Sequence, residues 1–203
     1  MRALFLLLPA SLALLQQARP LFYWGARTPL IDARDVEAPP EAARILTIQA
    51  ALDSGDLVLR FDLDRPVRAA THLPDGTPVS GRLQARLYVD GDADAATGLA
   101  GEGSRDPRVG AERMILLSTL YMGEDEEEGR PARALVQVAI DSLDAGGRRR
   151  TLWARDHLGA PDRIALHGDW LEARLPALQA AVGAGSRFVY AVGSSVREGR
   201  LER

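Results

Sequence analysis

Apolar and polar residues alternate with a period of two along much of the chain, which predicts β-strands. The alternation is clear in residues 57–64, 83–90, 134–140 and 171–175. In residues 57–64, for example, every second position is apolar and the intervening residues include Arg60. Because successive side chains on a strand point to opposite faces, one set should face the core and the other set water. Two further runs, 114–117 and 188–192, are apolar at every position and are expected to be buried strands.

Turn sequences separate these segments. Asp53-Ser54-Gly55-Asp56, Pro74-Asp75-Gly76 and Asp144-Ala145-Gly146-Gly147 are typical of hairpins. Roughly nine short strands with such spacing predict an all-β fold, an antiparallel β-sandwich of jelly-roll or Ig-like topology. One short helix is expected over Pro176–Val182, because proline favours the first helical position and Gly183 would follow the last turn.

The N-terminal residues have the pattern of an export signal. Arg2 precedes an apolar run from Ala3 to Leu15, which is shorter than the roughly 20 residues that span a bilayer. Residues 1–18 are therefore interpreted as a signal peptide, with retention as an uncleaved anchor as the alternative. Residues 19–40 are rich in proline and charge and form a lead-in, with at most one short strand around Pro29–Asp32. Residues 41–203 are interpreted as a single sandwich domain with no transmembrane span, located in the periplasm or secreted.

Composition narrows the classes of function. An apolar fraction of 46% in 203 residues is ordinary for a folded domain, and a net charge of −3 does not favour a nucleic-acid binder. The chain contains no cysteine, which excludes disulfides, thiol catalysis and cysteine-bound zinc. All basic residues other than histidine are arginine, which we attribute to codon bias in a GC-rich genome.

The loop after residue 89 has the strongest chemical pattern in the chain. Asp90, Asp92 and Asp94 alternate with small residues, and several carboxylates close together suit Ca²⁺, which takes six to eight oxygen ligands. An EF-hand is excluded, because its sixth position requires glycine and its twelfth requires glutamate, whereas this loop has Ala95 and Gly101 there. The alternative is a solvated acidic turn whose side chains bond to nearby backbone groups.

The same loop belongs to a longer pattern. Residues 87–98 read Leu-Tyr-Val-Asp-x-Asp-x-Asp-x-x-Thr-Gly, and Gly110-Ala111-Glu112 leads into the next strand. Together with Pro29-Leu30-Ile31-Asp32 and the segment from Trp170 to Pro176, this pattern resembles DOMON domains and family 9 carbohydrate-binding modules, which are extracytoplasmic β-sandwiches. The chain departs from those families at three places, with Ala33 for glycine, Gly91 for threonine and Glu112-Arg113 for Asp-Tyr.

The resemblance implies a calcium ion that supports the structure or a ligand near this loop. The oxygen donors it suggests are Asp90, Asp92, Asp94, Thr97 and Glu112. It also implies carbohydrate as a partner, for which Trp153 and Trp170 are candidates, since aromatic rings stack on sugar faces; packing in the core is the alternative role. Some DOMON relatives bind haem, but no methionine–histidine spacing here defines an axial pair, and haem is not expected.

Three classes of function remain after these steps. An exported, non-catalytic module that binds carbohydrate or another extracellular ligand is favoured. A structural or interaction module of a cell-envelope assembly is the alternative, and a glycoside hydrolase-like enzyme is the second alternative. The acidic run Glu124–Glu128 and the three arginines 148–150 are interpreted as exposed hairpin ends, although the acidic run could also hold a second cation.

Overall fold

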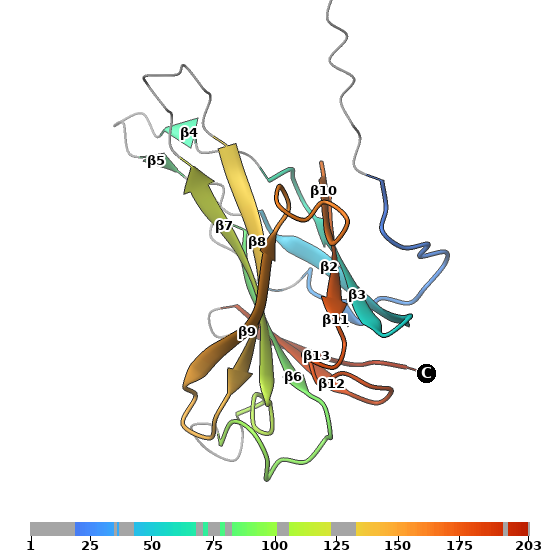
Figure 1. Cartoon of the computed structure of the whole chain (residues 1–203), viewed down its shortest axis with the longest axis vertical. Coiled ribbons are helices and arrows are strands. Elements are labelled where there is room, and N and C mark those ends of the chain that lie inside the picture. Colours follow the sequence, from blue (N-terminus) through green and yellow to red (C-terminus); the bar gives the residue numbers. More distant parts are fainter. Residues whose placement is uncertain are drawn as a thin grey trace, which may run out of the picture.

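A computed structural model describes residues 19–34, 36, 43–67, 71–72, 78–79, 83–100, 106–122, 133–192 and 195–202. These residues form two packed antiparallel sheets, with strand orders β1-β2-β3-β11-β10 and β13-β12-β6-β7-β8-β9, and a separate ribbon β4-β5 (Figure 1). The strands are β1 Ile31–Asp32, β2 Ile45–Asp53, β3 Asp56–Leu63, β4 Thr71–His72, β5 Pro78–Val79, β6 Gln84–Asp90, β7 Arg113–Met122, β8 Arg133–Leu143, β9 Arg149–Asp156, β10 Ile164–His167, β11 Trp170–Pro176, β12 Arg187–Val192 and β13 Ser195–Arg200.

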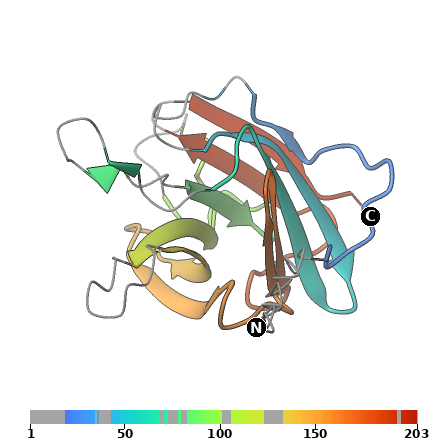
Figure 2. The same cartoon turned by 90° about the horizontal axis from the view of Figure 1, so that it is seen from above.

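The predicted β-sandwich is confirmed. The two sheets face each other and enclose the main core, to which both contribute alternate side chains of their strands (Figure 2). Phe61 of the five-stranded sheet and Phe188 of the six-stranded sheet are the two largest side chains that are completely buried. Such burial is the dominant stabilising contribution in a fold of this kind.

The predicted strands and two of the predicted turns are also confirmed. Residues 53–56 join β2 to β3, and residues 144–147 join β8 to β9. The fully apolar run 114–117 lies in β7, an interior strand between β6 and β8, which explains why neither of its faces is polar. The three arginines 148–150 are exposed at the β8–β9 hairpin, as expected.

The helix predicted over Pro176–Val182 is wrong. Pro176 still belongs to β11, where it pairs with Asp56, and the following residues form consecutive turns. Ala181 then adopts a left-handed backbone conformation with φ of 54°, which ends any right-handed turn. The few residues left between these two points are too short to repay the cost of nucleating a helix.

Residues 21–24 of the lead-in pack on the outer face of the five-stranded sheet. Trp24 is 7% exposed and packs with Ala51 and Val58 in a small cluster separate from the main core. Val58 belongs to the set of β3 residues expected to face water, and it is instead completely buried. The alternation of the strand is intact, but a remote segment of chain covers its second face.

Other parts of the sequence-based interpretation lie outside the described residues. These are the signal peptide 1–18, the Pro74-Asp75-Gly76 turn and the acidic run Glu124–Glu128. At the C-terminus, residues 195–200 form β13, which pairs with β12. The described part of the chain contains no helix with the length and hydrophobicity needed to cross a membrane.

His157 provides a test of the described packing. Its Nδ1 accepts a hydrogen bond of 3.1 Å from the N–H of Val136, and partial burial lowers its pKa below the ordinary 6.5. The unfolded chain therefore binds a proton more readily than the folded chain once the pH falls below about 6.5. The neutral His157 therefore makes its full contribution to the free energy of unfolding above about pH 6.5. We expect that contribution to decrease as the pH falls toward the pKa of the folded state.

The measurement is urea unfolding of the wild type and of His157→Asn between pH 7.5 and pH 5.5. Asparagine retains an acceptor for Val136 but does not titrate. The decrease in stability on acidification should be smaller in the variant. Equal pH dependence in the two proteins would contradict the assignment to His157.

Candidate metal centre

The acidic loop lies where β6 and β7 meet. Asp90 is the last residue of β6, and Glu112 directly precedes β7. Because the two strands are antiparallel neighbours, the end of one lies beside the start of the other, and the N–H of Glu112 donates to the carbonyl of Val89 at 3.0 Å. The topology thus brings Glu112 next to two carboxylates that are about twenty residues away in the sequence.

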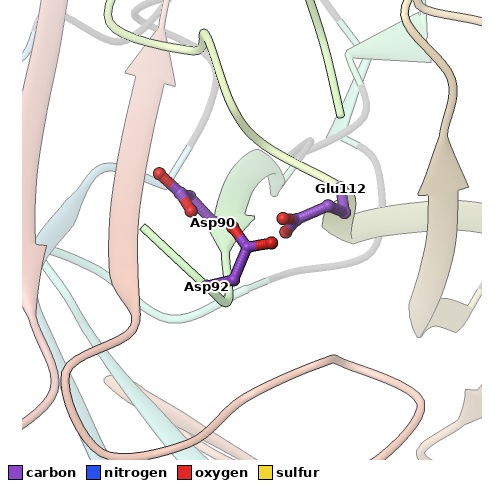
Figure 3. A group of neighbouring side chains, drawn as sticks. All are labelled: Asp90, Asp92 and Glu112. Atoms are coloured by element: carbon purple, nitrogen blue, oxygen red, sulfur yellow. The ribbon is translucent and has the colours of Figure 1, made fainter. Parts of the chain in front are cut away.

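Three of the predicted metal ligands converge. Asp90, Asp92 and Glu112 each offer one carboxylate oxygen, and these three oxygens all lie within 4.8 Å of one another (Figure 3). Calcium–oxygen distances are about 2.3–2.6 Å, so two oxygens on one ion are at most about 5 Å apart. The spacing of the three carboxylates is therefore compatible with a single bound cation.

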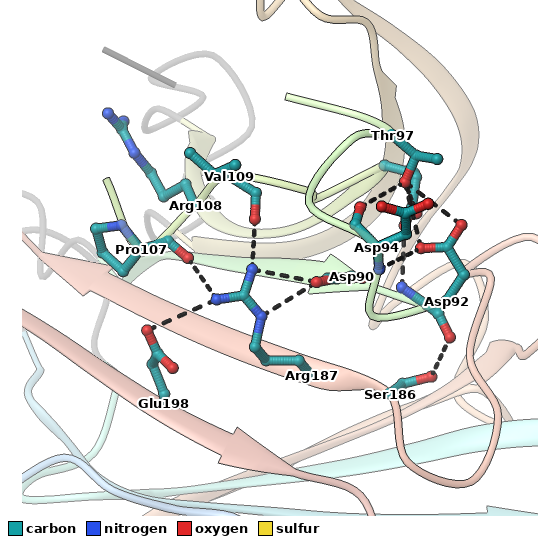
Figure 4. Close-up of polar contacts among 12 residues, drawn as sticks. Asp90, Asp92, Asp94, Thr97, Pro107, Arg108, Val109, Ser186, Arg187 and Glu198 are labelled. Atoms are coloured by element: carbon teal, nitrogen blue, oxygen red, sulfur yellow. Dashed lines mark hydrogen bonds and ion pairs between the residues drawn. The ribbon is translucent and has the colours of Figure 1, made fainter. Parts of the chain in front are cut away.

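The cluster has more hydrogen-bond acceptors than donors. The Thr97 hydroxyl oxygen lies 2.9 Å from Glu112 Oε1, 2.9 Å from the carbonyl of Asp94, and 3.2 and 3.4 Å from the two carboxylate oxygens of Asp92 (Figure 4). A hydroxyl has one proton and donates to one acceptor at a time. The remaining close oxygens repel one another, and a cation among them would relieve that repulsion.

Asp90 is the buried member of the cluster. It is 3% exposed, and its Oδ2 accepts a hydrogen bond of 3.1 Å from Nε of Arg187, whose Nη2 also lies 3.1 Å from that oxygen. Its other oxygen, Oδ1, is buried and has no hydrogen-bond partner among the described residues. Leaving a buried carboxylate oxygen unsatisfied is costly, and native structures usually provide it with a partner. A bound cation is a partner of the kind this oxygen lacks.

Arg187 holds Asp90 from the neighbouring strand β12, where the two residues lie directly opposite each other. Its guanidinium also donates to the carbonyls of Pro107 at 3.0 Å and Val109, and lies 3.8 Å from Glu198 (Figure 4). The same side chain therefore neutralises part of the Asp90 charge and ties down the second half of the loop. Sequence reasoning missed Arg187, because it is a single charged residue at the start of a buried strand and no local motif distinguishes it.

Asp94 does not join the other carboxylates. Its Oδ1 accepts the N–H of Ala96 at 2.9 Å, which closes a local turn of the kind aspartate commonly forms. Asp92 makes a similar turn, with its Oδ1 accepting the N–H of Asp94 at 2.9 Å. That hydrogen bond lowers the pKa of Asp92 below its ordinary 3.8, so this carboxylate is ionised at neutral pH.

Two glycines explain the path of the loop. A side chain at Gly91 would place its Cβ 2.1 Å from the carbonyl oxygen of Ala181, which excludes the threonine typical of the families that this pattern resembles. Gly98 has φ of 61°, and a Cβ there would lie 2.4 Å from the carbonyl of Ala111. The loop consequently folds tightly against β7 and against the turn before β12.

The two candidate sugar-stacking residues lie on different sheets. Trp153 is half-buried in β9 and packs against the main core, with the Arg155 guanidinium 5.8 Å from its ring centroid. Trp170, in β11, is stacked on His167 with ring centroids 5.2 Å apart. The structure therefore does not bring the two rings together into one binding platform.

Comparisons with family models, with curated proteins and with solved structures find no match for this chain.

Proposed function

We propose that this chain is a non-catalytic binding module of the periplasm or cell exterior, whose β6–β7 loop holds Ca²⁺ through Asp90, Asp92 and Glu112. The observation that carries the proposal is the buried Asp90, whose Oδ1 has no hydrogen-bond partner among the described residues and whose carboxylate is one of the three that converge. The resemblance of the loop to DOMON and carbohydrate-binding modules supports carbohydrate as the class of ligand, and the N-terminal apolar run supports export.

Calcium should stabilise the folded domain. A ligand that binds only the folded state raises the free energy of unfolding by RT ln(1 + [L]/Kd), about 2.7 kcal/mol at a hundredfold excess over Kd. The experiment is thermal unfolding after EDTA treatment, with calcium and then magnesium titrated back. We expect calcium to raise the Tm at lower concentration than magnesium, because magnesium demands stricter octahedral geometry.

Matched variants locate the ion. Asp92→Asn and Asp94→Asn each remove one negative charge from the same loop and retain an oxygen for the local turn. Asp92→Asn should weaken calcium binding at least tenfold, whereas Asp94→Asn should change it less than threefold. An equal loss of calcium affinity in the two variants would show that calcium responds only to the overall charge of the loop. If calcium does not change the Tm of the wild type, the loop is an acidic turn without a bound ion.

The two alternative functions predict different results when the same purified protein is assayed for saccharide binding and for turnover. A structural module of an envelope assembly would show calcium-dependent stability without binding any soluble saccharide. A glycoside hydrolase would release sugar from a polysaccharide, and replacement of a single acidic residue would abolish that turnover. We expect saccharide binding without turnover.

A further inference from the structure

A pocket of about 450 Å³ lies on the outer face of the six-stranded sheet, next to the candidate metal loop. Its floor includes Tyr88 of β6 and Met114 of β7, and one wall is Leu99 and Arg108 from the β6–β7 loop. The opposite wall is the β8–β9 hairpin. A volume of this size lies within the range of roughly 300–1,000 Å³ that small-molecule sites occupy.

Arginine side chains dominate the charge of this pocket. Arg86, Arg108 and Arg149 line it, and Asp106 is the one acidic residue among its lining residues. Arg86 is exposed and has no ion pair within the described part of the chain, whereas the half-exposed Arg149 forms a long ion pair with the buried Asp141 at 4.0 Å. The described residues therefore compensate the positive charge of this pocket only in part.

Arg108 is held in place in the wall. Its guanidinium forms a two-pronged pair with Asp106, with Nε–Oδ1 of 2.9 Å and Nη2–Oδ2 of 2.7 Å, and lies 5.8 Å from the centroid of the Tyr88 ring. The hydrogen bonds that Arg108 donates to Asp106 raise the pKa of Arg108 above its ordinary value. Asp106 neutralises this guanidinium, so the charge available to a ligand is that of Arg86 and, in part, that of Arg149.

We propose that this pocket binds a carboxylated saccharide, with Arg86 and Arg149 recognising the carboxylate. The planar guanidinium matches the two oxygens of a carboxylate, which favours this anion over a neutral sugar. Half-buried Leu99 and Leu143 offer apolar surface for the face of a sugar ring, and the exposed residues Ala145–Gly147 also line the pocket. The inference rests on the proposed function as a binding module and specifies its class of ligand.

The test is isothermal titration of the full-length protein, in buffer with calcium, with three probes. These are a galacturonic acid trisaccharide, the neutral galactose trisaccharide and acetate. The wild type should bind the acidic trisaccharide at least tenfold more tightly than either of the others. Acetate binding as tightly as the acidic sugar would overturn recognition of a saccharide, and equal affinity for the neutral sugar would overturn recognition of the carboxylate.

A charge-matched pair of variants tests the residues. Arg86→Ala/Arg149→Ala should weaken binding of the acidic trisaccharide at least tenfold. Because Arg149 also pairs with the buried Asp141, the titration is made at a temperature at which circular dichroism shows the variant to be folded. Arg148→Ala/Arg150→Ala removes the same charge from exposed positions that do not line the pocket, and it should change the affinity less than twofold. An equal loss in both variants would reduce the effect to general electrostatic attraction.

The two proposals fail separately. If calcium stabilises the wild type but none of the three probes binds, the proposed metal site stands and the proposed saccharide pocket is overturned. If the acidic trisaccharide binds but calcium does not change the Tm, the proposed saccharide pocket stands and the proposed metal site is overturned.

Discussion

Replacement of Arg187 with alanine is expected to lower the free energy of unfolding by about 3–5 kcal/mol in calcium-free buffer, because it leaves the Asp90 carboxylate buried without its counter-charge. The side chain of Asp90 is 4% exposed and that of Arg187 is 18% exposed, so water does not replace the lost partner easily. The carbonyls of Pro107 and Val109 lose a donor at the same time. Urea unfolding monitored by circular dichroism measures the change.

Calcium gives this prediction a second readout. If Asp90 is a ligand, the ion takes over part of the compensation of its charge, and a saturating calcium concentration should raise the Tm of Arg187→Ala more than that of the wild type. Adding Asp90→Asn to Arg187→Ala should recover stability relative to Arg187→Ala alone, since no buried charge then remains. A calcium response equal to that of the wild type would exclude Asp90 as a ligand, and a loss below 1 kcal/mol would show that the ion pair contributes little.

Replacement of Glu172 with alanine is expected to cost about 3 kcal/mol, because it removes the acceptor that holds the lead-in on the sandwich. Glu172 is completely buried on the outer face of β11. One of its carboxylate oxygens accepts the indole N–H of Trp24 at 2.7 Å, and the other accepts the backbone N–H of Leu21 at 2.5 Å. Arg60 lies 3.5 Å from the same carboxylate and retains Asp62 at 2.8 Å when Glu172 is lost.

The measurement combines urea unfolding with tryptophan fluorescence. Trp24 should become exposed in Glu172→Ala, which shifts the emission to longer wavelength, and trypsin should cleave after Arg27 faster than in the wild type. Glu172→Gln retains an acceptor oxygen for Trp24 and should lose less stability than the alanine variant. If the alanine variant loses stability without change in fluorescence or cleavage, the lead-in is held by its apolar contacts and not by this carboxylate.

Much of the fold could be predicted from the sequence because a strand buries one face with strict alternation. Leu57, Leu59 and Phe61 repeat every second residue, and burying that set requires a second layer. The hairpins at 53–56 and 144–147 follow from the local preferences of aspartate, serine and glycine in turns. The predicted helix at Pro176 failed because a local preference was outweighed by sheet pairing of the same residue with Asp56.

The candidate site was predictable in part. Asp90 and Asp92 are close in the sequence, and Glu112 was identified through the family-like pattern. The same pattern suggested Asp94, whose side chain instead closes its own turn at Ala96. Sequence spacing does not distinguish these two roles, because the orientation of each carboxylate depends on which backbone N–H groups the folded loop presents to it.

The sequence by itself determined the class of fold, the positions of most strands and the position of the acidic loop, since alternation and turn chemistry act over a few neighbouring residues. The tertiary structure decided that Arg187 pairs with Asp90, that Glu172 and Val58 are buried under the lead-in, and that arginines from β6, the β6–β7 loop and β9 line one pocket. These contacts join residues far apart in the chain. Sheet order and the path of the loops set them, and neither is encoded in any short segment.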